Sequence, residues 1–186
     1  MSTQNREKQN TLKILIISIL ILGCFACANQ PVNQEPPAYQ VIKSGQVLQL
    51  NENLLIPPES ATVYLQNGAI TQGNKIDQWS PNCRIVVERI TENERTIQPD
   101  EFVVTGIRYE RTYAANKPVM YASLFDTAES GLPIAEEFVI YLALKSDKQP
   151  FVKTLVCKHW EDPHNGYHLT MQQIKQALGN LFIFKE

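Results

Sequence analysis

Residues 61–71 read Ala-Thr-Val-Tyr-Leu-Gln-Asn-Gly-Ala-Ile-Thr, two short strand-like runs joined by Asn-Gly. Apolar and polar residues alternate in the first run, which is typical of a strand with one buried face. Asn67-Gly68 supplies the two positive φ angles of a type I′ turn, the turn that joins neighbouring antiparallel strands. Residues 61–71 therefore predict a β-hairpin, and with it an antiparallel sheet.

Similar strand-like runs recur along the chain. Residues 102–111, Phe-Val-Val-Thr-Gly-Ile-Arg-Tyr-Glu-Arg, alternate, and we expect Val103, Ile107 and Tyr109 on one face with the charged residues on the other. Prolines fall between the runs, as hydrogen bonding within a sheet requires. The other runs are residues 46–50, 83–90, 119–125, 137–144 and 151–159.

One helix is predicted near the end of the chain. Thr170 can cap its N-terminus, and Gln173 three residues later completes a capping box. Gly179 stands where a left-handed C-terminal cap is favoured. The apolar residues at helical spacing are Met171, Ile174 and Leu178. Short strands followed by one helix predict a mainly β (α+β) fold, in which an antiparallel sheet, as a sandwich or a partly open barrel, carries one C-terminal helix.

The composition fits one folded domain with short additions. The 186 residues are 44% hydrophobic and carry 17 basic and 19 acidic side chains, for a formal charge of −2. This balance lacks the basic footprint of nucleic-acid-binding proteins, so we expect no nucleic-acid partner. The content of 19% charged residues, 7 Tyr and 7 Phe argues against wholesale disorder.

The first residues form a leader rather than part of the fold. Arg6, Lys8 and Lys13 precede the apolar run Ile14–Leu22, which extends with small residues to Ala28 and then measures 15 residues. A membrane-spanning helix needs roughly 17–25 residues, so a cleaved export signal is expected. Retention of residues 12–28, uncleaved, in the inner membrane is the alternative.

The end of the leader resembles a bacterial lipoprotein signal peptide. Ile21-Leu-Gly-Cys24 is similar to the lipobox, whose Cys receives a diacylglycerol and becomes the N-terminus after cleavage. The resemblance implies a signal peptide at residues 1–23 and lipid attachment to Cys24, with Cys27 as the alternative acceptor. Secretion without a lipid is a further alternative. Neither Cys is followed by Asp, which in this family favours the outer membrane, with the domain facing the periplasm.

Residues 24–40 are expected to tether the domain, because the segment 28–40 is rich in Pro, Gln and Asn, a composition typical of extended linkers. Residues 41–186 then form the periplasmic domain. Removal of residues 1–23 leaves 14 basic and 18 acidic side chains, a charge of −4. The predicted membrane contact is therefore the N-terminal lipid, not electrostatic attraction to anionic lipids.

Two cysteines, Cys83 and Cys157, remain inside the domain. Each belongs to a strand-like run, and an oxidising compartment makes a disulfide the expected state of such a pair. Two separately buried thiols are the alternative.

All three histidines fall within residues 159–168, which read His-Trp-Glu-Asp-Pro-His-Asn-Gly-Tyr-His. Imidazole and carboxylate groups bind Zn²⁺, so a metal-binding protein or a metal-dependent hydrolase is an alternative function. The spacing matches no zinc motif, and Asp-Pro and Asn-Gly favour a structural turn between the last strand and the helix. The candidate ligands are His159, His164, His168, Glu161 and Asp162.

Other catalytic motifs do not occur in the sequence. It contains no Gly-x-Ser-x-Gly elbow, Ser-x-x-Lys pair, phosphate loop or dinucleotide-binding fingerprint. We therefore assign no catalytic residue and no cofactor. Trp79, Tyr64 and Tyr109 are candidates for an aromatic ligand platform, with core or half-buried sheet positions as the alternative.

Two stretches carry a further resemblance. One is Val63-Tyr-Leu-Gln-Asn-Gly68 with residues 76–83, Ile-Asp-Gln-Trp-Ser-Pro-Asn-Cys; the other is Cys157-Lys-His-Trp-Glu-Asp-Pro163 with residues 168–179. They resemble a group of small uncharacterised proteobacterial lipoproteins. The resemblance implies an exported, lipid-anchored protein with a Cys83–Cys157 bridge, and it adds no activity.

These features together predict a lipid-anchored cell-envelope protein. Its β-rich domain is expected to bind or support another envelope component, either a protein or part of the cell wall. No catalytic activity is inferred.

Overall fold

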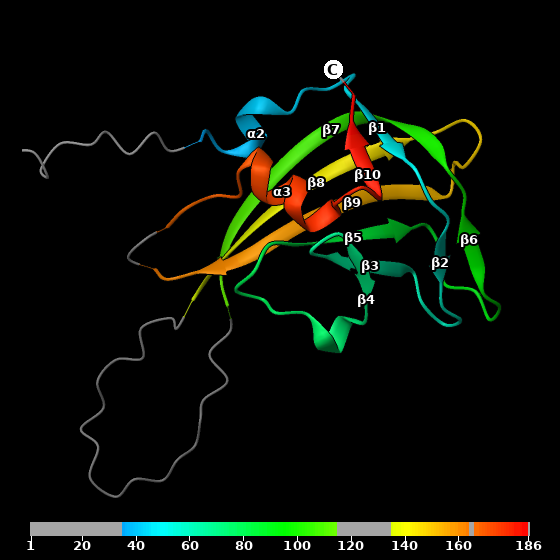
Figure 1. Ribbon diagram of the computed structural model, residues 1–186, viewed down its shortest axis with the longest axis horizontal. Coiled ribbons are helices and arrows are strands. Elements are labelled where there is room, and N and C mark those ends of the chain that lie inside the picture. Colours follow the sequence, from blue (N-terminus) through cyan, green and yellow to red (C-terminus); the bar gives the residue numbers. More distant parts are fainter. Residues whose placement is uncertain (1–34, 115–134, 164–165, 186) are drawn as a thin grey trace, which may run out of the picture. The chain divides into compact units, whose positions relative to one another are not determined.

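A computed structural model describes residues 35–114, 135–163 and 166–185. They belong to one compact unit, Glu35–Glu186, built on an eight-stranded antiparallel sheet in the order β10-β1-β7-β8-β9-β5-β3-β4. The sheet curls into a half-barrel around the helix α3, Met171–Leu178 (Figure 1). The predicted mainly β fold, with an antiparallel sheet and a C-terminal helix, is confirmed.

Two sheets and three short helical elements make up the described unit. No helix in this part of the chain combines the length and the hydrophobicity that a membrane crossing needs. The predicted strand at residues 119–125 lies outside the described residues. The large sheet contains β1 Val47–Leu50, β3 Thr62–Gln66, β4 Ala69–Thr71, β5 Asn82–Val87, β7 Asp100–Tyr113, β8 Glu136–Lys145, β9 Val152–Glu161 and β10 Phe182–Phe184. The small sheet pairs β2 Leu54–Ile56 with β6 Arg95–Ile97, and the other elements are α2 Ala38–Val41 and the 3₁₀ helix η2 Gly73–Lys75.

The hairpin predicted at residues 61–71 is confirmed as β3 and β4. Gln66 lies opposite Ala69, and the turn residues Asn67 and Gly68 have φ angles of 53° and 74°. The backbone N–H of Gly68 donates to the carbonyl oxygen of Ala177 in α3 at 3.1 Å. The turn therefore also anchors the hairpin to the helix.

A β-bulge in β7 changes which residues of that strand face the core. Phe102 and Val104 are fully buried, whereas Val103 is 39% exposed. The pairing with β8 shifts between Val104 and Gly106, and beyond the shift Ile107 packs against the core. The expectation that Val103 shares a face with Ile107 is therefore wrong, because one extra residue reverses the side of every later side chain.

Helix α3 fills the concave side of the sheet. The predicted capping box is present: the N–H of Gln173 donates to Thr170 Oγ1 at 3.3 Å, and the N–H of Thr170 donates to Gln173 Oε1 at 2.8 Å. A helix this short depends on packing for its stability. Its buried residues are Met171, Ile174, Ala177 and Leu178.

The predicted disulfide between Cys83 and Cys157 is present. The two cysteines lie directly opposite each other on β5 and β9, and each is 1% exposed. The bridge therefore joins two central strands inside the core under α3.

The segment that precedes residue 41 contacts the domain. Residues 35–40, assigned above to the tether, belong to the compact unit. The N–H of Ala38 donates to the carbonyl oxygen of Leu169 at 2.7 Å, and Ala38 is fully buried. Glu35 Oε1 accepts from the N–H of Gln172 at the start of α3, at 3.1 Å. Residues 35–40 therefore pack against the domain.

Candidate functional site

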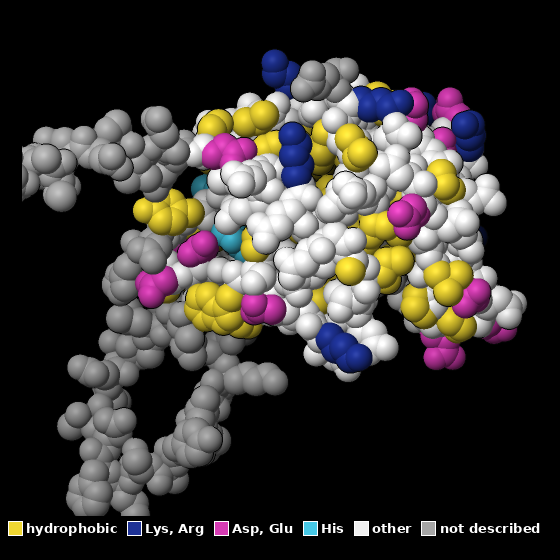
Figure 2. Space-filling model, viewed as in Figure 1, with side chains coloured by type: hydrophobic (Ala, Val, Ile, Leu, Met, Phe, Trp, Pro, Cys, Tyr) yellow, Lys and Arg dark blue, Asp and Glu magenta, His cyan; other side chains and the backbone are white. Residues whose placement is uncertain are grey.

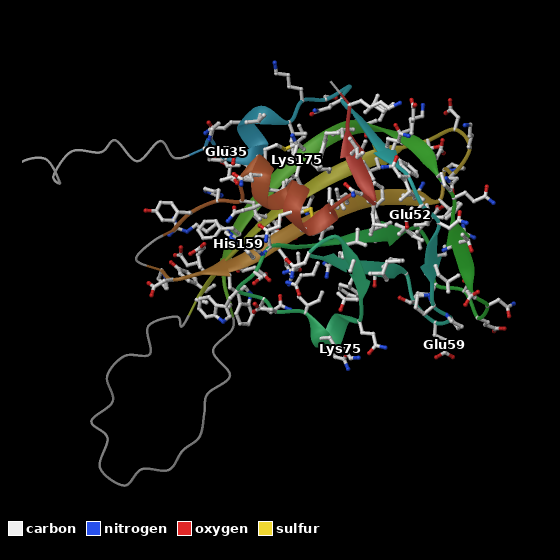
Figure 3. All side chains as sticks on the ribbon, viewed as in Figure 1. Glu35, Glu52, Glu59, Lys75, His159 and Lys175 are labelled. Atoms are coloured by element: carbon white, nitrogen blue, oxygen red, sulfur yellow. A yellow bond between two sulfur atoms is a disulfide. The ribbon has the colours of Figure 1, made fainter. Side chains whose placement is uncertain are left out.

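His159 is a buried side chain of β9 (Figure 3). Its ring is 1% exposed, and Nε2 donates to the carbonyl oxygen of Tyr167 at 2.9 Å. Nδ1 lies 3.7 Å from a carboxylate oxygen of Glu161. Burial lowers the pKa of His159 below its ordinary value of 6.5, against the opposing effects of the carbonyl group and Glu161. The neutral ring therefore links β9 to the segment that leads into α3.

His168 is surrounded by aromatic rings. Edge-to-face contacts place its ring centroid 5.1 Å from Tyr39, 5.7 Å from Tyr109 and 4.7 Å from Phe138. Tyr39 in turn stacks on Tyr109 at 4.2 Å. Burial lowers the pKa of His168, and the positive charge of Arg111 adds to this effect. The ring therefore helps dock α2 onto β7.

The metal-site interpretation gains no support from the described residues. Among residues 35–114, 135–163 and 166–185, no three His, Cys, Asp or Glu side chains gather in a way that could hold a metal ion. His159 and His168 instead make the structural contacts given above. His164 lies outside the described residues.

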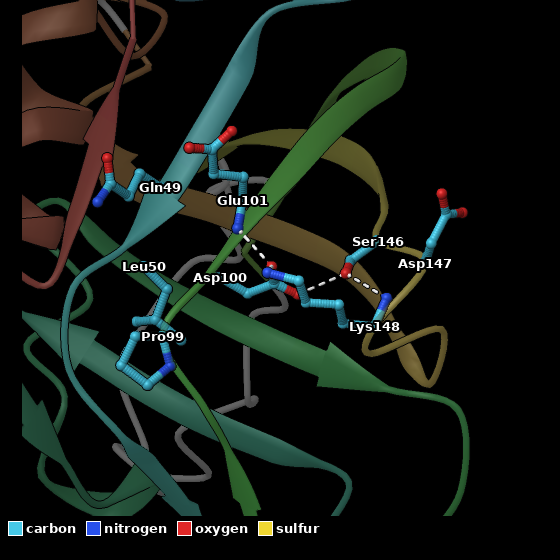
Figure 4. A pocket seen from close by; sticks show the side chains of 8 residues that line it. All are labelled: Gln49, Leu50, Pro99, Asp100, Glu101, Ser146, Asp147 and Lys148. Carbon is cyan, nitrogen blue, oxygen red and sulfur yellow. Dashed lines mark hydrogen bonds and ion pairs between the residues drawn. The ribbon is translucent and has the colours of Figure 1, made fainter.

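A polar pocket of about 560 Å³ lies where the β8–β9 loop meets β7 (Figure 4). Asp100 is its buried charge, with a side chain only 4% exposed. Asp100 Oδ2 accepts hydrogen bonds from Ser146 Oγ at 2.5 Å and Gln149 Nε2 at 3.2 Å, and Lys148 Nζ lies 3.6 Å from Oδ1. Burial raises the pKa of Asp100, but these hydrogen bonds and the N–H of Glu101 outweigh it and lower the pKa below 3.8.

The polar groups of this pocket have a structural role: they hold the β8–β9 loop against β7. Ser146 Oγ donates to Asp100 and also accepts from the backbone N–H groups of Lys148 and Gln149, at 3.1 and 3.2 Å. The Ser146 hydroxyl therefore already donates one hydrogen bond and accepts two. Because the pKa of Asp100 is lowered, its carboxylate is also a weak base for deprotonating this hydroxyl. Asp100 fixes the β8–β9 loop against β7.

A pair of tryptophans marks a different surface, at the end of β9. Trp79 and Trp160 meet edge to face, with centroids 5.9 Å apart and planes at 84°. Trp160 Nε1 and Lys158 Nζ both donate to Glu137 Oε1, at 3.3 and 2.7 Å. We call Trp79, Trp160, Glu137 and Lys158 the tryptophan corner.

The loop that carries Trp79 is held by hydrogen bonds from Asp77 and Gln66. Asp77 Oδ1 accepts from the N–H of Trp79 at 3.1 Å, and Oδ2 accepts from Ser80 Oγ at 2.6 Å. The Gln66 side chain binds the backbone of Asp77 on both sides. Its Nε2 donates to the Asp77 carbonyl oxygen at 2.8 Å, and its Oε1 accepts from the Asp77 N–H at 3.1 Å. Trp79 nevertheless remains 50% exposed. The backbone at Trp79 is thus held by hydrogen bonds while half of the side chain stays exposed.

The three aromatic residues proposed from sequence do not form one platform. Tyr109 stacks on Tyr39, whereas the Tyr64 ring lies so close to Gly73 that an added β-carbon there would be 3.0 Å from it. Trp79 pairs with Trp160, which the sequence did not single out as a binding residue. The alternation of β9 is the signal that could have placed Trp160 and Lys158 together on the outer face.

The surface seen in Figure 2 shows basic and acidic side chains interspersed, without a continuous basic patch on that face. Comparison with known proteins adds no assignment: no family model, no curated protein and no solved structure matches the chain.

Proposed function

We propose that this chain is a lipid-anchored protein of the cell envelope that binds another envelope component through the tryptophan corner. Cys24 carries the lipid, with Cys27 as the alternative acceptor, and the domain faces the periplasm from the outer membrane. The single observation that carries the binding role is Trp79, which is half exposed and packs edge to face on Trp160. No catalytic residue is assigned.

Two features support the location. The leader and the lipobox-like Ile21-Leu-Gly-Cys24 precede the domain. The Cys83–Cys157 bridge agrees with folding in an oxidising compartment, because structural disulfides are rare in the cytosol.

The physical argument for binding concerns Trp79. Burying a large apolar side chain lowers the free energy, yet half of the Trp79 side chain stays exposed. Tryptophan is enriched among the residues that dominate binding energy, and a side chain held in place loses little entropy on binding. The hydrogen bonds of Asp77 hold the backbone at Trp79, and the edge-to-face contact with Trp160 orients the indole.

The anchor and the binding surface are tested separately. Cys24→Ser should abolish acylation and release the protein from the membrane fraction, whereas Cys27→Ser should leave both unchanged. If neither substitution, alone or combined, changes fractionation, the anchor assignment is wrong.

For binding, the purified full-length protein in detergent should co-sediment with isolated cell-wall sacculi or with an envelope protein fraction. Trp79→Ala should remove this co-sedimentation, whereas Ile90→Ala, at a residue 65% exposed elsewhere, should not. Equal co-sedimentation of Trp79→Ala and the unchanged protein would contradict the proposed surface.

A further inference from the structure

The outer face of the sheet, opposite α3, carries a row of side chains aligned across four strands. Arg84 on β5 lies opposite Val156 on β9, Val156 opposite Tyr141 on β8, and Tyr141 opposite Arg108 on β7. Trp160 lies four residues along β9 from Val156, and therefore about 13 Å away at ~3.3 Å per residue. The row and the tryptophan corner thus share one face.

Most charges on this face have partners. Arg108 forms an ion pair with Glu110 and lies 4.1 Å over the ring of Tyr141, whose hydroxyl donates to Glu110 at 2.9 Å. Lys158 pairs with Glu137 at 2.7 Å. These contacts pair the positive charges of Arg108, at the β7 end of the row, and of Lys158, two residues from Val156 on β9.

Arg84 differs from these residues. It is half-buried, its Nε is buried without a hydrogen-bond partner, and no carboxylate of the described residues lies within ion-pair distance of it. A buried donor without a hydrogen-bond partner costs free energy, so the unpaired Nε of Arg84 requires an explanation. Arg84 stands at the β5 end of the row, opposite Val156 on β9.

Beside the row lies an open pocket of about 350 Å³. The absence of a side chain at Gly106 and the small side chain of Ala143 leave this space next to Arg108 and Tyr141. Its remaining wall includes Thr154, whose hydroxyl can donate or accept a hydrogen bond. The outer face therefore offers an aromatic pair at the tryptophan corner, a cation without an ion-pair partner at the β5 end of the row, and an open hollow beside the β7–β8 end.

We infer that this face binds an acidic oligosaccharide, with one sugar ring on Trp79 and a carboxylate or phosphate group on Arg84. The inference rests on the proposed function and names the chemical class of its ligand. A pyranose presents an apolar C–H face that packs on an indole, and hydroxyl groups at its rim that reach Glu137 and Lys158. A guanidinium forms its strongest hydrogen bonds with planar carboxylates and with phosphates. The distance from Trp160 to the row requires a ligand of several linked rings.

The shape of the tryptophan corner favours a flat ring over a peptide side chain. Trp79 and Trp160 form an exposed edge-to-face pair, and the adjoining groups are a carboxylate and an ammonium group. An aliphatic side chain could form no hydrogen bond with these groups. A sugar hydroxyl can both donate to Glu137 and accept from Lys158.

The test uses the purified full-length protein in detergent and three probes: neutral chitotetraose, a tetrasaccharide of alternating N-acetylglucosamine and N-acetylmuramic acid, and phosphorylated core oligosaccharide from lipopolysaccharide. Titration calorimetry should show at least one acidic probe binding about tenfold more tightly than chitotetraose. The better of the two acidic probes identifies carboxylate or phosphate as the group on Arg84. Added salt should weaken acidic binding and leave neutral binding unchanged.

Two substitutions separate the platform from the cation. Trp79→Ala should abolish binding of all probes, whereas Arg84→Gln should lower acidic affinity about tenfold and leave neutral affinity unchanged. Arg84→Lys keeps the charge and should retain part of the acidic preference. Lys145→Gln, at a side chain 71% exposed, is the matched control and should change nothing. Thermal unfolding of each variant checks that it folds.

Three results would overturn the inference: equal affinity for neutral and acidic probes, an Arg84→Gln variant that keeps the acidic preference, or no binding of any oligosaccharide. If Trp79→Ala still removes co-sedimentation with envelope material in such a case, the proposed function stands and only its ligand class is wrong. If Trp79→Ala has no effect in either assay, both fail.

Discussion

Gly68, in the β3–β4 turn, lies directly against Gly179, which ends α3. A β-carbon added to Gly179 would lie 2.4 Å from the Gly68 α-carbon, and one added to Gly68 would lie 3.1 Å from the Gly179 α-carbon. Both residues have positive φ angles, 74° and 56°. The hairpin and the helix therefore meet backbone to backbone, so the concave side of the sheet closes at this point only with glycine in both places.

The first prediction concerns this contact. Gly179→Ala should lower the free energy of unfolding by about 3 kcal/mol or more, because it combines backbone strain with a clash against backbone atoms that cannot move aside. Gly45→Ala is the control: its φ is 91° but nothing lies within 4 Å of the added carbon. It should cost only about 1–2 kcal/mol. Urea unfolding of the two variants measures the difference, and equal losses would show that the Gly68–Gly179 contact is loose.

The second prediction concerns the disulfide. The double variant Cys83→Ala with Cys157→Ala should lose about 4 kcal/mol of stability, since the bridge spans 74 residues and restricts the unfolded chain. Thermal unfolding checks this, with the unchanged protein under strong reductant as the comparison. An unaltered melting temperature in both cases would mean that the bridge contributes nothing.

The third prediction concerns pH. Burial lowers the folded-state pKa values of His159 and His168 below 6.5, so below that pH the unfolded chain binds protons that the folded protein does not. Stability should therefore be full above about pH 6.5 and decrease as the pH falls toward the folded-state values. His159→Gln, which keeps a donor for Tyr167 but cannot titrate, should flatten this decrease. Urea titrations between about pH 8 and pH 5 measure it, and a flat profile for the unchanged protein would contradict the assignment.

Asp100 should produce a separate decrease in more acidic solution. Its folded-state pKa lies below 3.8, so the stability that it contributes is present above that pH and is lost as the pH falls through the folded value. Asp100→Asn should remove this second decrease and lower stability at neutral pH. Circular dichroism during acid titration compares Asp100→Asn with the unchanged protein. An acid transition that is the same in both would show that the contact between the β8–β9 loop and β7 does not depend on the charge of Asp100.

The fifth prediction concerns the contacts of residues 35–40. Tyr39→Ala should destabilise the protein by about 1–2 kcal/mol, because the stack on Tyr109 and the contact with His168 are lost. Val41→Ala, in the same short helix but 42% exposed, should change stability by less than about 0.5 kcal/mol. Equal effects would place residues 35–40 back in a loosely attached tether.

The parts of the fold that could be predicted from sequence are those fixed by local chemistry. Asn67-Gly68 determines its own turn, and Thr170 with Gln173 determines the start of α3. The pairing of Cys83 with Cys157 was predicted because only two cysteines remain in the domain and an oxidising compartment is expected, not because of any local sequence pattern.

The parts that could not be predicted depend on contacts between distant residues. The bulge near Gly106 exists only in relation to β8, so an unbroken alternation was expected. Ala38 and Tyr39 follow a Pro-rich stretch, and only their contacts with Leu169 and Tyr109 place them in the domain. The tryptophan corner joins a loop to β8 and β9, so no single stretch of sequence contains it.

The most direct test of the account is native mass spectrometry of the full-length protein recovered from cell membranes. The account predicts a chain that begins at Cys24, carries acyl groups on that residue and lacks two hydrogens because Cys83 and Cys157 are bridged. Retention of Met1, or absence of acyl groups from both Cys24 and Cys27, would contradict the anchor. A bound divalent metal would instead favour the metal-site interpretation of His159, His164 and His168.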